Sequence, residues 1–296
     1  MTSTTTTTTT RPSLTVRRTS LGGRLVAFLL LAYLISWGWV ITWAAQGDRV
    51  RDGRGWPTHF PALVGPMLAA VVVTAVTGGR RGLSGLLGTM SRWRIGWRWW
   101  AAAISPLLCF LVVLGLLALT GTVPPARDFA RFSGLPAGLG LVGVWFVVVV
   151  VNGFGEETGW RGFALPLLQE RFSPLGATAI LSAVWAAWHI PQFFFLDSFR
   201  DFAPPMIPVW LYGLFCGAVI MTWIYNRTGS VLAVAVFHAL YNLTGSTAAA
   251  SDQSGLLSIV MWAAVVVGAI VLMRAEHGAR RQGRSILAPV GSRSPS

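Results

Sequence analysis

The sequence contains no lysine, only two cysteines and only ten acidic residues. Charged side chains make up 11% of its 296 residues and hydrophobic side chains 54%, and this balance excludes an ordinary soluble domain. Cys109 and Cys216 both lie within apolar runs, where they pack as small hydrophobic groups, so a disulfide framework and a cysteine-based metal site are excluded. The sequence therefore predicts an all-α, polytopic membrane protein.

The positive charge of the chain comes from arginine alone, and the formal net charge is +13. The arginines are spread over separate loops, and no nucleic-acid recognition module is readable. The excess therefore indicates loops held at the cytoplasmic face, and no nucleic-acid partner is expected. Exclusive use of arginine, together with many alanines and valines, is typical of a GC-rich bacterial genome, so we expect a multi-pass protein of the bacterial plasma membrane.

The first 20 residues, "MTSTTTTTTTRPSLTVRRTS", form a low-complexity polar tail, and we predict that they are disordered. The "RRTSL" at the end of this tail also suits a signal peptide. However, the uncharged stretch over residues 25–47 is longer than a typical signal segment and long enough to span a membrane. We therefore expect a retained first helix, a helical membrane domain over residues 21–275 and a basic cytoplasmic tail over residues 276–296.

Charges divide the chain into uncharged intervals, each able to hold the roughly 20 apolar residues that cross about 30 Å of hydrocarbon. These intervals are residues 25–47, 55–79, 99–126, 132–155, 172–196, 202–226, 228–251 and 253–273. The sequence therefore predicts about eight transmembrane helices around a buried polar chamber.

The distribution of arginine predicts the orientation, because cytoplasmic loops carry an excess of this residue. If the chain alternates sides, one side receives Arg11, Arg17, Arg18, Arg24, Arg80, Arg81, Arg92, Arg94, Arg98, Arg171, Arg227, Arg274, Arg280, Arg281 and Arg284. The other side receives Arg49, Arg51, Arg54, Arg127, Arg131 and Arg200, most of them near aspartates. We therefore expect both termini to be cytoplasmic.

A few ionisable side chains lie in or beside apolar stretches, where they are costly and usually face a protein interior or an aqueous cavity. They are Glu156, Glu157, Arg161, His189 and His238. Glu156 lies 14 residues before Glu170, and His189 lies 15 residues after Pro174. At about 1.5 Å per residue, both lie roughly 21–22 Å from the turn between these helices, provided that the glycines around Glu156 do not unwind the first helix.

His238 and Asn242 are four residues apart, project from the same helical face and overlap this depth. Each group also has a simpler interpretation. Glu157 and Arg161 suit a plain ion pair, His189 suits a packing histidine, and His238 with Asn242 suits interhelical hydrogen bonding. Their shared depth favours a common site, because independent packing residues are not expected to lie at one level.

This set of side chains suits hydrolysis. A carboxylate beside a histidine can activate water as a general base. A second histidine with an amide can donate hydrogen bonds to the oxyanion that forms when this water attacks a peptide carbonyl. The residues themselves therefore predict a hydrolase.

Three ordered motifs sharpen this prediction: "EETGWR", "WAAWH" and "HALYN" fit Glu-Glu-x-x-x-Arg, aromatic-x-x-x-His and His-x-x-x-Asn. Over residues 145–244 the chain resembles the type II CAAX prenyl endopeptidases, also called the bacteriocin-processing or abortive-infection family of intramembrane glutamic proteases. The resemblance implies a catalytic core over these residues and hydrolysis of a peptide bond in a membrane-associated peptide or protein. It implies no cofactor and no metal.

The resemblance also assigns roles by position. Glu156 and His189 would activate the attacking water, and His238 and Asn242 would form the oxyanion hole. Glu157 and Arg161 would support the geometry and charge of the site. Trp185 departs from the family, which more often has phenylalanine at this position, and the larger ring would alter the width of the pocket and the choice of substrate.

Other functions suit the same residues. Glu156, His189 and His238 could supply three ligands to zinc, although the sequence contains no H-E-x-x-H. The protein could also be a non-catalytic membrane scaffold, an immunity factor or a transporter that uses the acidic pair as a proton relay. We expect the lipid bilayer and a peptide substrate as partners, with a chamber that opens toward the cytoplasm.

Overall fold

The computed structural model describes residues 20–51, 54–119, 121, 123–250 and 254–290. The predicted disordered tail lies outside this range, apart from Ser20. Within the described residues the chain forms helices and their connections but no strand, and one isolated β-bridge joins Val50 to Leu196. The all-α prediction is confirmed.

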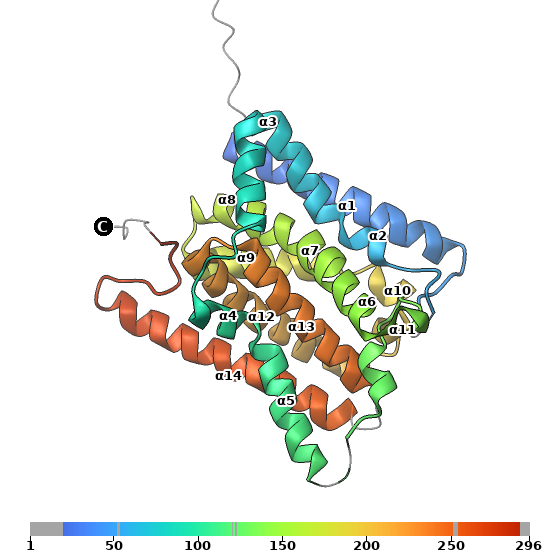
Figure 1. Cartoon of the computed structure of the whole chain (residues 1–296). Helices are drawn as coiled ribbons and strands as arrows, with labels where there is room; N and C mark the ends of the chain where they lie inside the picture. The colour runs from blue at the N-terminus through green and yellow to red at the C-terminus, as the bar shows by residue number, and fades with distance from the viewer. Residues whose placement is uncertain (1–19, 52–53, 120, 122, 251–253, 291–296) are drawn as a thin grey trace, which may run out of the picture.

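The helices follow the chain in the order that Figure 1 colours from blue to red. They are α1 (Leu21–Ala45), α2 (Phe60–Leu63), α3 (Gly65–Met90), α4 (Trp97–Ala103), α5 (Ser105–Ala118), α6 (Gly140–Val147), α7 (Phe154–Gly159), α8 (Leu165–Gln169), α9 (Pro174–Trp188), α10 (Gln192–Phe195), α11 (Asp197–Arg200), α12 (Ile207–Thr228), α13 (Val231–Ala250) and α14 (Ser254–Arg280).

Five helical stretches of the described chain are long and apolar enough to cross a membrane. They are Leu21–Ala45, Phe60–Met90, Ala137–Gln169, Pro204–Thr228 and Gly255–Arg280, and a bent pair, α4 with α5 at 62°, makes up to six. Multiple apolar helices support a multi-pass membrane protein, but the count of eight is not confirmed. The two remaining intervals do hold helices: α9 has only 15 residues, and α13 runs over Val231–Ala250.

Helix ends in the core follow from local sequence. Ser173 caps the N-terminus of α9 by accepting a hydrogen bond from the Gly176 N–H, and Pro174 at the first helical position needs no partner for its nitrogen. Helix α12 ends just before Gly229, whose φ of 63° places it in the left-handed region that glycine tolerates best. These signals fix the turns from which α9 and α13 enter the bundle.

The segment that carries the two glutamates stays helical, as the predicted depth of Glu156 requires. Two π-helical turns, Val148–Gly153 and Trp160–Ala164, flank α7 and keep it continuous with α6 and α8. The glycines here serve close packing and do not unwind the helix. A Cβ at Gly153 would lie 2.6 Å from the Ala235 carbonyl oxygen, and one at Gly155 would lie 2.7 Å from the Leu63 carbonyl oxygen. Wide π turns often occur at functional sites.

Helix α13 lies near the middle of the bundle and contacts α5, α7, α12 and α14, while α1 and α3 pack together at one side (Figure 1). In this view α10 and α11 lie on the right. The central position of α13 brings its face toward the α7 segment, where the predicted site residues lie.

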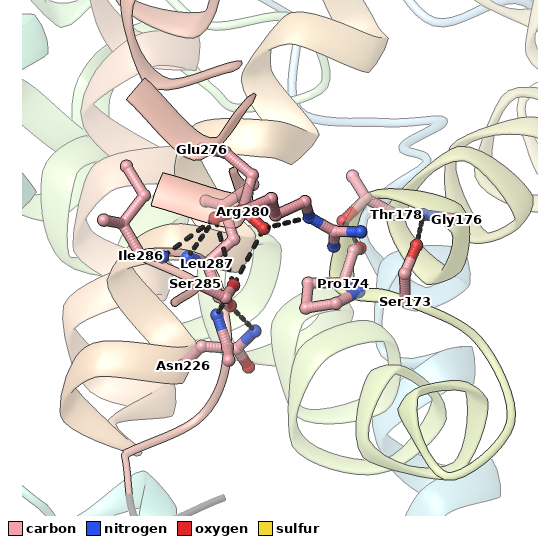
Figure 2. A network of polar contacts seen from close by, with 11 residues as sticks. Ser173, Pro174, Gly176, Thr178, Asn226, Glu276, Arg280, Ser285, Ile286 and Leu287 are labelled. Atoms are coloured by element: carbon pink, nitrogen blue, oxygen red, sulfur yellow. Dashed lines mark hydrogen bonds and ion pairs between the residues drawn. The ribbon is translucent and has the colours of Figure 1, made fainter. Parts of the chain in front are cut away.

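The chain after α14 folds back and is held by one buried carboxylate (Figure 2). The Glu276 side chain, which is fully buried, accepts hydrogen bonds from Arg280 Nε at 2.6 Å and from the Ser285 hydroxyl at 2.8 Å. It also accepts the N–H groups of Ile286 at 2.8 Å and Leu287 at 3.0 Å. The Asn226 side chain donates to the Leu287 carbonyl at 2.6 Å, so the segment over residues 285–290 is joined to the end of α12.

Replacing Glu276 with alanine is expected to release this segment, because two backbone N–H groups and a hydroxyl lose their acceptor. We expect the free energy of unfolding to fall by about 2–4 kcal/mol. Trypsin should then cleave after Arg281 and Arg284 faster than in the unmodified protein, as measured by mass spectrometry. Glu170→Ala, which changes an exposed acid, is the control, and equal cleavage in both variants would contradict the anchoring role.

Candidate active site

Glu156 lies in α7 with its carboxylate held at both oxygens, although the side chain is only 2% exposed. Asn152, one turn earlier, donates from Nδ2 to Oε1 at 2.8 Å. Trp185 of α9 donates from its indole nitrogen to Oε2 at 2.8 Å. Each carboxylate oxygen keeps further lone-pair capacity for a water molecule. The carboxylate is therefore oriented by donors from two elements and can still accept a proton.

The Glu157 side chain does not line the cavity and instead binds Arg161 and His238. Its Oε1 accepts from Arg161 Nη1 at 2.9 Å and from His238 Nδ1 at 2.8 Å, while its Oε2 is buried without a hydrogen-bond partner. The Arg161 guanidinium carbon lies 4.7 Å from the centre of the Trp185 ring, within range for a cation–π contact. The predicted ion pair exists, but it also holds a histidine of α13.

His189 follows the last residue of α9 and closes that helix. Its Nδ1 lies 2.7 Å from the Trp185 carbonyl oxygen. Because a carbonyl can only accept, Nδ1 carries a proton and Nε2 is left as the ring atom for chemistry. The ring stacks on Phe199 with centroids 6.0 Å apart and meets the edge of Trp210 at 5.5 Å, which fixes its plane.

His238 and Asn242 project from the same face of α13, as their spacing predicts. The bond between His238 Nδ1 and the Glu157 carboxylate assigns a proton to Nδ1 and leaves Nε2 on the other side of the ring. Asn242 donates from Nδ2 to the Asn152 Oδ1 at 2.8 Å. Since Asn152 in turn donates to Glu156, a chain of amides connects the oxyanion candidate to the carboxylate.

One cavity of about 710 Å³ collects four of the six predicted residues: Glu156, His189, His238 and Asn242 all line it. Glu157 and Arg161 do not line it, and they lie behind His238 and Trp185 with exposures of 0% and 1%. Among the described residues no hydrogen bond joins Glu156 to His189, and Trp185 forms hydrogen bonds with both.

Several residues of the site are not identified by sequence reasoning. Asn152 is a single polar residue at the end of a valine run, and its position one helical turn before Glu156 is the only sequence feature that indicates a contact between them. The sequence predicts that Trp185 alters the width of the pocket, and the structure adds that its indole nitrogen donates a hydrogen bond to the Glu156 carboxylate. His59 and Gln192 also line the cavity and are 6% and 5% exposed. Both lie in short connecting elements, where neither helical period nor charge marks them.

The cavity wall includes the segment over residues 196–202, where Ser198 and Asp201 are exposed. This segment lies at the end of the bundle occupied by α10 and α11 (Figure 1). The arginine count predicts that these residues lie on the side opposite both termini, and the opening of the chamber toward the cytoplasm stays a prediction.

The zinc alternative requires three ligands close together. In the part of the chain that the structure describes, no group of three histidine, cysteine, aspartate or glutamate side chains is placed to hold a metal ion. Glu156, His189 and His238 thus share a cavity without forming such a set.

Two comparisons with known proteins identify similar proteins. Residues 138–244 match the family model described as type II CAAX prenyl endopeptidase Rce1-like. CAAX prenyl protease 2 from Methanococcus maripaludis is 29% identical over an alignment of 159 residues, and this alignment covers 48% of this chain and 55% of that protein. The chain therefore matches about half the length of this relative. The resemblance inferred from the three motifs is confirmed, and all six predicted site residues lie inside the matched region.

Proposed function

Because residues 138–244 are similar to the Rce1-like type II CAAX prenyl endopeptidases, we propose that the protein is an intramembrane endopeptidase of the glutamic type. It hydrolyses a peptide bond in a membrane-associated peptide or protein. The observation that carries the proposal is the shared cavity, in which Glu156, His189, His238 and Asn242 converge from three helices. With the arginine count, we also propose a bacterial plasma-membrane location with both termini cytoplasmic.

The first step is the activation of water by Glu156. Asn152 and Trp185 hold the carboxylate so that it can accept a proton without reorienting. His189 presents its Nε2 to the cavity and accepts a second hydrogen bond from the same water, which positions the water oxygen toward the peptide carbonyl. The water oxygen bonds to the carbonyl carbon, and its proton passes to Glu156.

The second step is the stabilisation of the oxyanion on the former carbonyl oxygen. Glu156, Glu157 and Arg161 together carry one excess negative charge when the carboxylates are ionised. A protonated His238 balances that charge and provides an Nε2–H donor, and Asn242 adds the Nδ2 hydrogen that Asn152 does not use. When the carbon–nitrogen bond breaks, the proton held by Glu156 passes to the departing amine.

The proposal is tested by comparing peptides in membranes of cells that carry the unmodified protein, Glu156→Ala, His189→Ala or a deletion. We expect mass spectrometry to find peptides that depend on the unmodified protein and are absent with both variants. If the protein changes the peptide pool relative to the deletion and both variants do the same, the protease assignment fails and a scaffold or immunity role is favoured. Solute or proton movement in proteoliposomes without cleavage would favour a transporter.

Removal of metal ions gives a separate prediction. Because the proposed chemistry uses Glu156 as the base and no metal, hydrolysis by the purified protein is expected to change by less than about twofold after treatment with a strong chelator. Zinc catalysis would instead depend on a bound ion that polarises water and substrate. A loss of activity that added zinc restores would replace the glutamic mechanism with the zinc mechanism.

A further inference from the structure

The cavity wall is acidic, whereas the protein as a whole is strongly basic. The chain has a formal net charge of +13. Yet the charged side chains that line the cavity are Glu156, Asp197 and Asp201, and no arginine of the described residues lines it. Glu156 lies deep, and the two aspartates lie in and beside α11, where Asp201 is exposed. The local charge therefore has the opposite sign to that of the protein.

The carboxylates of Asp197 and Asp201 are not neutralised by neighbouring groups. They are four residues apart on one side of α11, and neither makes a side-chain hydrogen bond or an ion pair within the described chain. Arg200 lies between them in sequence, but its guanidinium donates to the Phe194 carbonyl at 3.2 Å. Val50 packs behind α11, and its neighbours Arg49 and Arg51 do not line the cavity.

This acidic rim is held firmly in place. The N–H of Val50 donates to the Phe195 carbonyl at 2.9 Å, and the N–H of Asp197 donates to the Val50 carbonyl at 3.1 Å. Val50, Phe195 and Leu196 are buried together with Ala62 of α2. Because the backbone around Asp197 is fixed from two sides, a ligand that binds the rim does not have to order a loose loop.

A buried polar side chain in the cavity wall independently points to a ligand. Gln192 is 5% exposed, lines the cavity, and its side-chain amide makes no hydrogen bond within the described chain. Buried polar groups are normally paired, and an unpaired one is costly. A polar peptide main chain in the cavity would supply the missing partners for this amide.

We propose that this cavity selects a substrate with a basic side chain near the scissile bond. The cation binds Asp197 and Asp201, the adjoining main chain meets Gln192, and the scissile carbonyl reaches Glu156. The inference rests on the proposed function and adds the class of substrate. The aromatic part of the wall, which includes Phe199 and Trp210, suits apolar residues beside the cation. The protein contains 23 arginines, but none of the described ones lines the cavity. The chain's own cations therefore do not compete with the substrate for Asp197 and Asp201.

The test measures binding without cleavage, using the full chain with Glu156→Gln in zwitterionic lipid nanodiscs. The probes are two fluorescein-labelled peptides with one apolar leucine–alanine segment, followed by either an arginine pair or a glutamine pair. We expect the arginine probe to bind about five- to tenfold more tightly, with a preference that weakens as salt rises. Adding Asp197→Asn and Asp201→Asn should remove this preference and leave binding of the glutamine probe unchanged.

The matched control adds Asp48→Asn and Glu170→Gln, which change the net charge by the same amount at positions outside the cavity. This control should keep the preference. Equal binding of both probes to the Glu156→Gln protein, or the same loss of preference in the control, would overturn the cationic substrate. Because this test does not measure cleavage, the two proposals can fail separately. An unmodified protein that cleaves no membrane peptide disproves the protease function. The binding results instead decide whether Asp197 and Asp201 select a basic side chain.

Discussion

Glu156→Gln is expected to lower the rate of peptide hydrolysis by about a thousandfold, within the range that a positioned general base contributes. Glutamine has nearly the shape of glutamate but cannot accept the proton of the attacking water. The amide also offers one acceptor oxygen to a site with two donors, Asn152 and Trp185, so one of these hydrogen bonds is lost. The rate is measured on a peptide identified from the membrane comparison, by mass spectrometry under single-turnover conditions.

The matched control is Glu170→Gln, which makes the same chemical change at an exposed position near the other end of the same helical segment. It should cleave at close to the unmodified rate. The melting temperature of Glu156→Gln separates a loss of chemistry from a loss of folding, because only one neutral hydrogen bond is at risk. Residual activity within about tenfold of the unmodified protein would show that Glu156 is not the general base.

The candidate site could be predicted to a large extent because its residues are chemically conspicuous. Ionisable groups are rare in apolar stretches, and helical spacing converts their sequence positions into depth. Glu156, His189 and His238 meet these conditions and share the cavity. His59 and Asn152 also line the cavity, but their placement depends on how α2 and the π turn before α7 pack against other helices. Sequence periodicity contains no information about such contacts.

The sequence predicts the all-α class correctly, but the predicted number of eight membrane-spanning helices is not confirmed. Uncharged intervals record where charge is absent, whereas a spanning helix also needs length and a straight axis. The interval that contains α9 includes Pro191, and the helix ends at Trp188, with only 15 residues. The interval over residues 99–126 is bent by 62° between α4 and α5, and Pro106 lies in the first turn of α5. These breaks come from backbone geometry, to which a charge map is insensitive.

Orientation shows a different limit of the sequence. The arginine count predicts that both termini are cytoplasmic and that Arg200, with its neighbouring aspartates, lies on the opposite side. The same sequence reasoning predicts a chamber that opens toward the cytoplasm, although Asp197 and Asp201 line the cavity. If the rim faces outward, peptides reach Glu156 from the outer leaflet or the space beyond it. Labelling of a single cysteine introduced at Ser198 by a membrane-impermeant reagent would report the side directly.

Arg161→Met is expected to lower the free energy of unfolding by about 3–5 kcal/mol, because it removes one partner of a buried ion pair and leaves Glu157 with a single bond to His238. Arg161 is 1% exposed and lies over the Trp185 ring, so its loss also opens the packing behind Glu156. Thermal and denaturant unfolding of the protein in detergent would measure the change.

The double variant Glu157→Gln with Arg161→Met tests whether charge or shape explains that loss. Removing both charges eliminates the uncompensated carboxylate, so we expect the double variant to be more stable than Arg161→Met alone. The two side chains are in direct contact, and the costs of the single substitutions are therefore not expected to add. Hydrolysis should nevertheless stay low, because a neutral glutamine cannot hold a protonated His238 in place as an oxyanion donor. A double variant less stable than both single variants would instead show that Glu157 and Arg161 stabilise the helices mainly through packing. Recovery of activity together with stability would remove His238 from the proposed oxyanion hole.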